Sequence, residues 1–223
     1  MKVFFEERTE LVPGIWQYSF RPERPVDFIP GQYVDLRLPG VQGDPRGNAR
    51  VLSMTSLPSD PSLTFLLKHF ELQSPYKQVL QAMQPGDEAS ISDAMGDLVL
   101  PKSPDVPLVF VAGGIGIASF VSMIKALLSA REERQIFLFY GLRSQREQIC
   151  RDVLEAYPLA LKQIAIAPNR LNAAEIKDST PPDALVYISG SEKFVEGLRR
   201  GLMELGTPHE NIAFDYFDGY SEL

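Results

Sequence analysis

The 223-residue chain contains very few of the residues that bind metal clusters or cross-link a fold. It has one cysteine, Cys150, and two histidines, His69 and His209. One cysteine excludes both an intrachain disulfide framework and a four-cysteine iron–sulfur cluster, and we expect no metal site. Cys150 falls on a predicted helix away from the motifs below, so we expect it to pack as a small apolar group.

Long apolar runs and excess positive charge are also missing. No stretch approaches the roughly 18 consecutive apolar residues that a membrane-spanning helix needs. The net charge of −7 argues against nucleic-acid binding. The first seven residues become acidic too early for a secretory signal peptide. We therefore expect a cytoplasmic protein that neither spans a membrane nor binds nucleic acid.

Proline is unevenly distributed, and 13 of the 18 prolines precede residue 108. Proline interrupts helices, so this half favours short strands joined by turns. One helix is predicted at 74–83, with Ser74 as its N-cap and Pro75 at its first position. Six turn-separated strands indicate an antiparallel barrel, and they are predicted at 3–11, 15–21, 33–38, 50–55, 63–70 and 88–92.

Three prolines in residues 101–107 indicate a linker, and we place the domain boundary between residues 103 and 104. Beyond it, strands alternate with helices, which predicts a parallel, doubly wound sheet covered on both faces. The predicted strands are 108–112, 135–140, 164–167, 184–188 and 211–217. The predicted helices cover 117–128, 145–157 and the segment from Phe194 to Leu205. Ligands on such sheets bind beyond the carboxyl ends of the strands.

A glycine turn follows the first of these strands, at Gly113, Gly114 and Gly116. Glycines let a backbone approach a ligand closely, and the free N–H groups that open the next helix attract an anion. This is typical of a pyrophosphate site. Ser119 replaces the third glycine of the usual dinucleotide fingerprint, so a tight turn without a ligand remains the alternative.

A second motif lies in the proline-rich half, at Arg50-Val51-Leu52-Ser53. It places a cation for a phosphate beside a hydroxyl for a ring nitrogen. Taken alone, Arg50 is equally compatible with a surface arginine on a strand.

Both motifs occur in the order found in the ferredoxin–NADP reductase superfamily, which the chain resembles over nearly its whole length. The matching segments are 28–33, 50–53, 113–118, 139–143, 187–191 and 212–217. The resemblance implies a β + α/β protein, with a flavin (FAD)-binding antiparallel β-barrel at 1–103 and an NAD(P)-binding α/β domain at 104–223.

The resemblance also implies roles for individual residues. Ser53 would donate toward the flavin N5, and Asp215 and Ser189 would lie near the nicotinamide; these three form the expected catalytic set. Phe217 is expected over the flavin by motif position, with Tyr220 as the alternative. The expected cofactor-binding residues are Arg50, Val51, Leu52, Ser53, Lys68, His69, Phe70, Gln73, Ser74, Gly113, Gly114, Ile115, Gly116, Arg143, Gly190, Phe217 and Tyr220.

Four positions depart from the family pattern. Leu52 replaces an aromatic residue that stacks on the flavin, and Gln73 replaces the glycine before Ser74. Ser119 replaces a common proline, and Ser189 replaces the cysteine near the nicotinamide. These changes loosen cofactor placement without removing a necessary group.

The function implied is that of an NAD(P)H-dependent flavin oxidoreductase. Hydride would pass from the nicotinamide to FAD, and electrons would pass to a separate acceptor: ferredoxin, flavodoxin, an oxygenase component, a haem partner or a quinone. A flavin reductase that uses free flavin as substrate is one alternative, and a non-catalytic flavin-binding regulatory or docking subunit is another. NADH versus NADPH stays open, although Arg143, Arg146 and Arg170 are candidates for a 2′-phosphate. We expect a monomer or weak dimer.

Overall fold

The computed structural model of the chain describes residues 1–69 and 73–217. It divides into two compact units, Met1–Val99 and Leu100–Leu223, each described by itself below. Two of the predicted cofactor-binding residues, Phe70 and Tyr220, lie outside the described residues.

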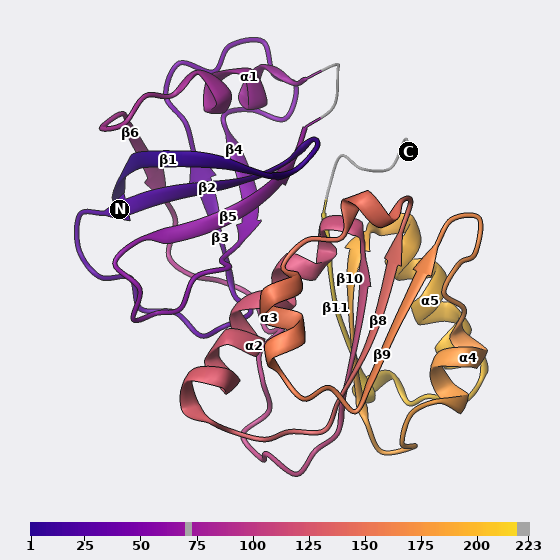
Figure 1. Cartoon of the computed structure of the whole chain (residues 1–223). Helices are drawn as coiled ribbons and strands as arrows, with labels where there is room; N and C mark the ends of the chain where they lie inside the picture. Colours follow the sequence, from indigo (N-terminus) through magenta and orange to yellow (C-terminus); the bar gives the residue numbers. More distant parts are fainter. Residues whose placement is uncertain (70–72, 218–223) are drawn as a thin grey trace. The chain divides into compact units, whose positions relative to one another are not determined.

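The first unit is an antiparallel sheet of six strands with one helix (Figure 1). The elements are β1 (Lys2–Val12), β2 (Ile15–Pro22), β3 (Tyr33–Arg37), β4 (Ala49–Ser53), β5 (Leu63–Lys68), α1 (Pro75–Ala82) and β6 (Glu88–Ile91). The strand order is β4-β3-β6-β1-β2-β5. An isolated antiparallel bridge joins Met54, the residue after β4, to Phe65 on β5, and so draws the two edges of the sheet toward closure. The predicted barrel is confirmed.

Alternating burial along the strands fills this barrel with aromatic rings. In β3, Val34 and Leu36 are buried while their neighbours are more exposed. Phe5 on β1 packs edge-on against Phe20 on β2, with ring centroids 5.5 Å apart. This period of two is the pattern that one buried sheet face requires.

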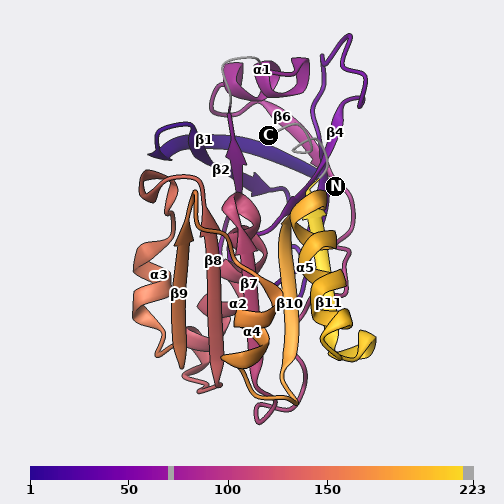
Figure 2. The ribbon, with the colours of Figure 1, turned by 90° about the vertical axis from the view of Figure 1, so that its right-hand side faces the viewer.

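The second unit is a five-stranded parallel sheet between helices. Its strands are β7 (Leu108–Gly113), β8 (Ile136–Leu142), β9 (Leu161–Ile166), β10 (Leu185–Ser191) and β11 (Ile212–Phe217), in the order β11-β10-β7-β8-β9. Its helices are α2 (Ala118–Ala130), α3 (Arg151–Ala156), α4 (Ala173–Asp178) and α5 (Glu192–Glu204), with 3₁₀ turns η1 (Gly114–Ile117), η2 (Gln145–Glu147) and η3 (His209–Asn211). Helices α2 and α3 cover one face of the sheet, and α4 and α5 cover the other (Figures 1 and 2). The doubly wound prediction is confirmed, and the strand order reverses between β7 and β10.

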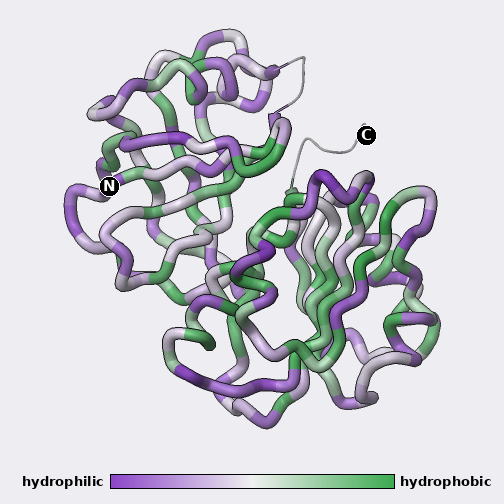
Figure 3. The backbone as a smooth tube through the Cα atoms, viewed as in Figure 1, coloured by the Kyte–Doolittle hydropathy of each residue, from purple (hydrophilic) through white to green (hydrophobic). Residues whose placement is uncertain are grey.

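The central strands are apolar along their length, as the hydropathy colouring of the second unit shows (Figure 3). All five residues from Leu108 to Ala112 are fully buried. Phe110 stacks on Phe120 of α2, with ring centroids 4.5 Å apart and planes inclined by 3°. Burial on both faces explains why this strand reads as a continuous apolar run. Among the described residues, no helix has the length and apolar character needed to cross a bilayer.

Two predictions for the second unit were wrong in detail, and one helix was not predicted. The helix expected at 145–157 is divided into η2 and α3, because Cys150 takes a left-handed conformation (φ 54°) between them. Strand β9 begins at Leu161 rather than at residue 164, and its residues are all half-buried, which gives a weak apolar pattern. Helix α4 was not predicted, since its six residues bury only Ile176.

Candidate functional site

The glycine turn lies where β7 ends, at the reversal of strand order. Gly113 is the last residue of β7 and pairs with Gly141 of β8. Gly114 opens η1 with a φ of +55°, a left-handed conformation that favours glycine. The turn therefore occupies the place at which doubly wound sheets bind ligands.

The glycines of this turn, and Gly190 on β10, are needed for different reasons. A Cβ added at Gly116 would lie 2.2 Å from the carbonyl oxygen of Ser189. Added at Gly113 or Gly190, it would lie 2.8 Å from Cδ1 of Phe194 on α5. Internal packing thus explains these three glycines. At Gly114 an added Cβ would meet nothing within 4 Å, so its backbone is the part of the turn that is open to a ligand.

Sheet register brings the two predicted catalytic residues of the second unit together. Ser189 on β10 pairs with Asp215 on β11, and two residues further along Ser191 pairs with Phe217. Ser189 is fully buried, and its Oγ lies 3.1 Å from Oγ of Ser119, which is also fully buried. The Ser189 hydroxyl is thus directed into the unit, toward the start of α2.

The remaining predicted residues of this unit differ in exposure. Ile115 is buried within η1, whereas Arg143 is exposed just after the end of β8. Phe194, which the sequence reasoning missed, covers the glycine backbone at the carboxyl ends of β7 and β10. The sequence did contain a signal for Phe194. It stands three residues after Ser191, and glycines occur at the ends of both strands at the switch point.

In the first unit, Arg50 projects from β4 into a dense set of acceptors and is only 8% exposed. One terminal nitrogen donates to Oδ2 of Asp44 at 2.6 Å, and the other donates to the carbonyl oxygens of Ala49 (2.7 Å) and Gly47 (3.0 Å). The guanidinium carbon lies 4.6 Å from the ring centroid of Tyr76 on α1. These contacts fix the guanidinium at the beginning of that helix.

The carboxylate of Asp44 lies between Arg50 and the first turn of α1 and accepts from both. Its Oδ2 also accepts from the backbone N–H of Tyr76 at 3.0 Å, and its Oδ1 accepts from the N–H of Arg46 at 2.9 Å. Burial alone would raise the pKa of Asp44, but the hydrogen bonds from Arg50 and the two N–H groups together lower it to about 2. Guanidinium groups and helix N–H groups are donors that bind phosphate oxygens. Arg50 and the Tyr76 N–H therefore suit a phosphate group.

Helix α1 begins as predicted. Ser74 is its N-cap and accepts a hydrogen bond from the N–H of Lys77 at 3.4 Å, and Pro75 follows at the first helical position. The Lys77 ammonium donates to the carbonyl oxygen of Lys68 at 2.6 Å. Burial, and then the nearby charges of Arg46 and Arg50, lower the pKa of Lys77 to about 8.

Three members of this cluster were missed by the sequence reasoning: Asp44, Tyr76 and Lys77. A signal existed for Lys77, because it stands three residues after a recognised N-cap and so in the first helical turn. Asp44 lies in a glycine- and proline-rich loop, and nothing local in the sequence brings that loop to α1.

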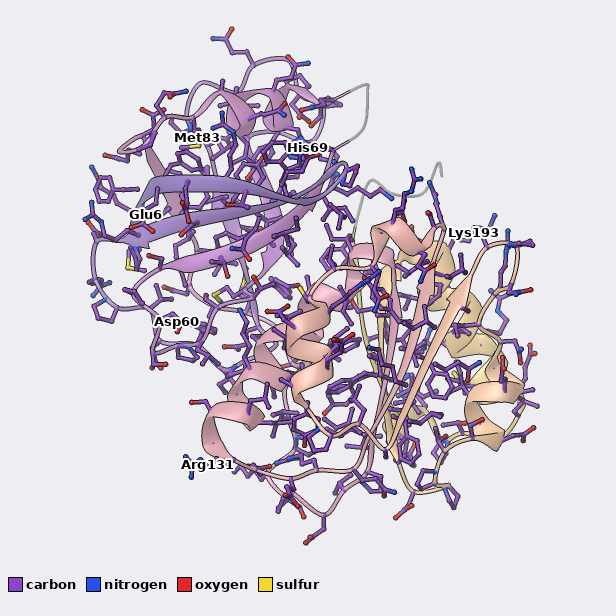
Figure 4. The ribbon with its side chains drawn as sticks, in the orientation of Figure 1. Glu6, Asp60, His69, Met83, Arg131 and Lys193 are labelled. Atoms are coloured by element: carbon purple, nitrogen blue, oxygen red, sulfur yellow. The ribbon has the colours of Figure 1, made fainter. Side chains whose placement is uncertain are left out.

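His69 and Gln73 hydrogen-bond to each other. Nδ1 of His69 lies 3.1 Å from Oε1 of Gln73, and Nε2 lies 2.9 Å from the hydroxyl of Tyr18. Because an amide oxygen only accepts, we assign the proton to Nδ1 and let the Tyr18 hydroxyl donate to Nε2. Burial lowers the pKa of His69, which directly follows β5 (Figure 4), and so favours the neutral ring.

The rest of the Arg50 motif alternates along β4. Val51 is 43% exposed, whereas Leu52 is buried in the barrel core and Ser53 is 3% exposed. Leu52 thus packs inside the barrel in the position where the family pattern has an aromatic residue.

Comparison with known proteins agrees with this geometry. Residues 110–200 match the oxidoreductase NAD-binding domain family. The chain is 31% identical over 150 residues to the phenol hydroxylase P5 protein of Acinetobacter pittii, covering 67% of this chain and 41% of that protein. It is 27% identical over 211 residues to the reductase component of the naphthalene 1,2-dioxygenase system of Pseudomonas putida, covering 88% and 62%.

Among solved structures, a ferredoxin NADP⁺ reductase from Neisseria gonorrhoeae with bound FAD and NADP superposes with a TM-score of 0.79 at 19% identity, covering 97% of this chain and 98% of that one. The chain spans about half the length of the curated relatives that it matches. The predicted resemblance is confirmed: residues 110–200 match the oxidoreductase NAD-binding domain family, and the two-domain fold of the chain is like that of a ferredoxin NADP⁺ reductase.

Proposed function

We propose that the protein is an NAD(P)H-dependent flavoprotein oxidoreductase that delivers electrons to a separate acceptor. One observation carries the proposal: the chain that matches the NAD-binding domain family also contains a barrel whose Arg50 and Tyr76 N–H both donate to the Asp44 carboxylate, and such a pair of donors suits a phosphate. A barrel that binds a phosphate, in the same chain as a nucleotide-binding domain, would serve flavin chemistry.

In the first unit, the flavin phosphate would be held by Arg50, Lys77 and the N–H groups that open α1. Ser53, at the end of β4, would donate to the flavin ring. The chemistry supplied when both cofactors are bound is hydride transfer from nicotinamide to flavin, followed by release of electrons. The residues of the chain contribute binding, orientation and exclusion of water.

In the second unit, the open backbone at Gly114 would approach the pyrophosphate of NAD(P)H. Asp215 lies beside Ser189 in the sheet, and we propose that it faces the nicotinamide end. The Ser119 hydroxyl would keep that of Ser189 oriented. Arg143 is exposed after β8 and is available to a 2′-phosphate.

The names of the two relatives, a phenol hydroxylase protein and a dioxygenase reductase component, support an oxygenase component or ferredoxin as the acceptor. We further propose that the chain works in the cytoplasm as a monomer or weak dimer, since its single cysteine suits a reducing compartment.

The proposal is tested by purifying the chain, identifying any released flavin and assaying NADH and NADPH oxidation with several acceptors. Yellow protein that oxidises one nucleotide supports it. Colourless protein that is active only with added flavin would instead support a flavin reductase, and yellow protein inert to both nucleotides would support a regulatory subunit.

A further inference from the structure

The loop between β3 and β4 carries a carboxylate into the cationic cluster that we assign to the flavin phosphate. The neighbouring residues Gly43 and Pro45 are exposed, yet the Asp44 side chain is only 1% exposed. Its burial comes from its contact with Arg50 and the start of α1.

One oxygen of Asp44 receives both phosphate-type donors. Oδ2 accepts from Arg50 at 2.6 Å and from the Tyr76 N–H at 3.0 Å. A phosphate oxygen in the same place would need the same two donors. Two anions repel each other at such distances, so a phosphate and the carboxylate cannot share them.

The loop around Asp44 contains three glycines with left-handed backbone conformations. Gly40, Gly43 and Gly47 surround Asp44 in the chain and have φ values of +76°, +69° and +73°. A Cβ added at any of the three would meet nothing within 4 Å, whereas the carbonyl oxygen of Gly47 accepts from Arg50 at 3.0 Å and Val41 packs against the barrel core. The Asp44 side chain would therefore turn away from Arg50 while the loop keeps these contacts.

We infer that Asp44 is an internal competitor of the flavin phosphate, which must displace the carboxylate from Arg50 and α1 before it binds. This inference rests on the proposed flavin site and deepens it. The consequence is a flavin held more weakly than the donors alone would hold it. Because Asp44 stays ionised at neutral pH, an incoming anion rather than protonation releases the donors.

The test compares the full chain with its Asp44→Asn and Asp44→Ala variants by fluorescence titration with FAD. Asparagine keeps the shape and an acceptor oxygen but removes the charge. We expect the FAD dissociation constant to fall about tenfold in both variants, the order of one charge-assisted hydrogen bond to the competing carboxylate. Asp60→Asn is the control, because Asp60 is an exposed carboxylate of the same unit that accepts from the Leu57 N–H at 2.8 Å; its FAD affinity should not change.

Calorimetric titration with inorganic pyrophosphate repeats the comparison without the flavin ring. Folded Asp44 variants that bind FAD and pyrophosphate no more tightly than the parent would overturn the inference, and weaker binding would make Asp44 a residue that positions Arg50 instead. If no variant binds FAD, the proposed flavin site fails, while the pyrophosphate affinities still decide whether Asp44 competes with anions.

Discussion

The hydroxyl oxygens of Ser119 and Ser189 lie 3.1 Å apart, and both residues are fully buried. These are two of the positions at which the chain departs from the family pattern. The departures therefore form one contact, which joins the first turn of α2 to the carboxyl end of β10.

The first prediction concerns this pair. The two buried hydroxyls hydrogen-bond to each other. The losses of unfolding free energy caused by Ser119→Ala and by Ser189→Ala should therefore not be additive. We expect a coupling free energy of about 0.5–1.5 kcal/mol from urea unfolding of the two single variants and the double variant. Additive effects would mean that the contact contributes nothing to stability.

The second prediction separates packing from ligand approach in the glycine turn. Gly116→Ala places a Cβ 2.2 Å from a carbonyl oxygen, so it should destabilise the fold by roughly 3 kcal/mol or more. Gly114→Ala meets no neighbour and should cost only about 1–2 kcal/mol of backbone strain. Gly114→Ala should nevertheless raise the Michaelis constant for NAD(P)H strongly, because the added Cβ would occupy space that we assign to the pyrophosphate. FAD affinity should be kept. If folded Gly114→Ala keeps a normal Michaelis constant for NAD(P)H, this segment is only a turn and does not bind the nucleotide.

The third prediction concerns Arg50. Removing its guanidinium takes away a charge-assisted phosphate contact, so Arg50→Ala should weaken FAD binding by roughly 1.5–3 kcal/mol. Arg50→Lys should recover part of the loss, since an ammonium replaces the charge but not the planar fork. Arg37→Ala, at an exposed position on the neighbouring strand β3, is the matched control. Fluorescence titration that gives equal affinities for all four proteins would place the phosphate elsewhere.

The fourth prediction is a pH dependence. Burial and two nearby arginines lower the pKa of Lys77 from 10.5 to about 8, so its ammonium loses its proton as the pH rises through 8. A bound phosphate favours the charged form, and FAD affinity should therefore be highest below pH 8 and fall between pH 8 and about 10. Lys77→Met should flatten that profile, whereas Lys193→Met, at an exposed position near the start of α5 (Figure 4), should keep it. A parent profile that stays level across this range would contradict the assignment of Lys77.

Sequence patterns predicted the folds of both units because apolar residues recur at the spacing of strands and helices along the chain. Alternation in β3 and the unbroken apolar run of β7 both appear in the residues themselves. The Ser74 cap was equally visible, since a cap is settled by neighbours in the chain. Helix α4 and the break at Cys150 were missed, because a six-residue helix has no sustained period and a left-handed cysteine has no sequence signal.

The candidate site was less predictable because its contacts join distant segments. Asp44 reaches Tyr76 across 32 positions, and Ser119 reaches Ser189 across 70. Motif reasoning located Arg50 correctly in a strand but not the carboxylate that accompanies it. It did not show that the backbone of Ser189 also requires a glycine at position 116.

The central claim is that this one chain carries electrons from a nicotinamide nucleotide to a flavin. The most direct test mixes the FAD-loaded chain with NADH or NADPH in the absence of oxygen and follows the visible absorbance of the flavin. The account predicts that the absorbance bleaches with one of the nucleotides, more slowly in Ser53→Ala and in Gly114→Ala. Bound flavin whose absorbance stays unchanged at saturating concentrations of both nucleotides would contradict it.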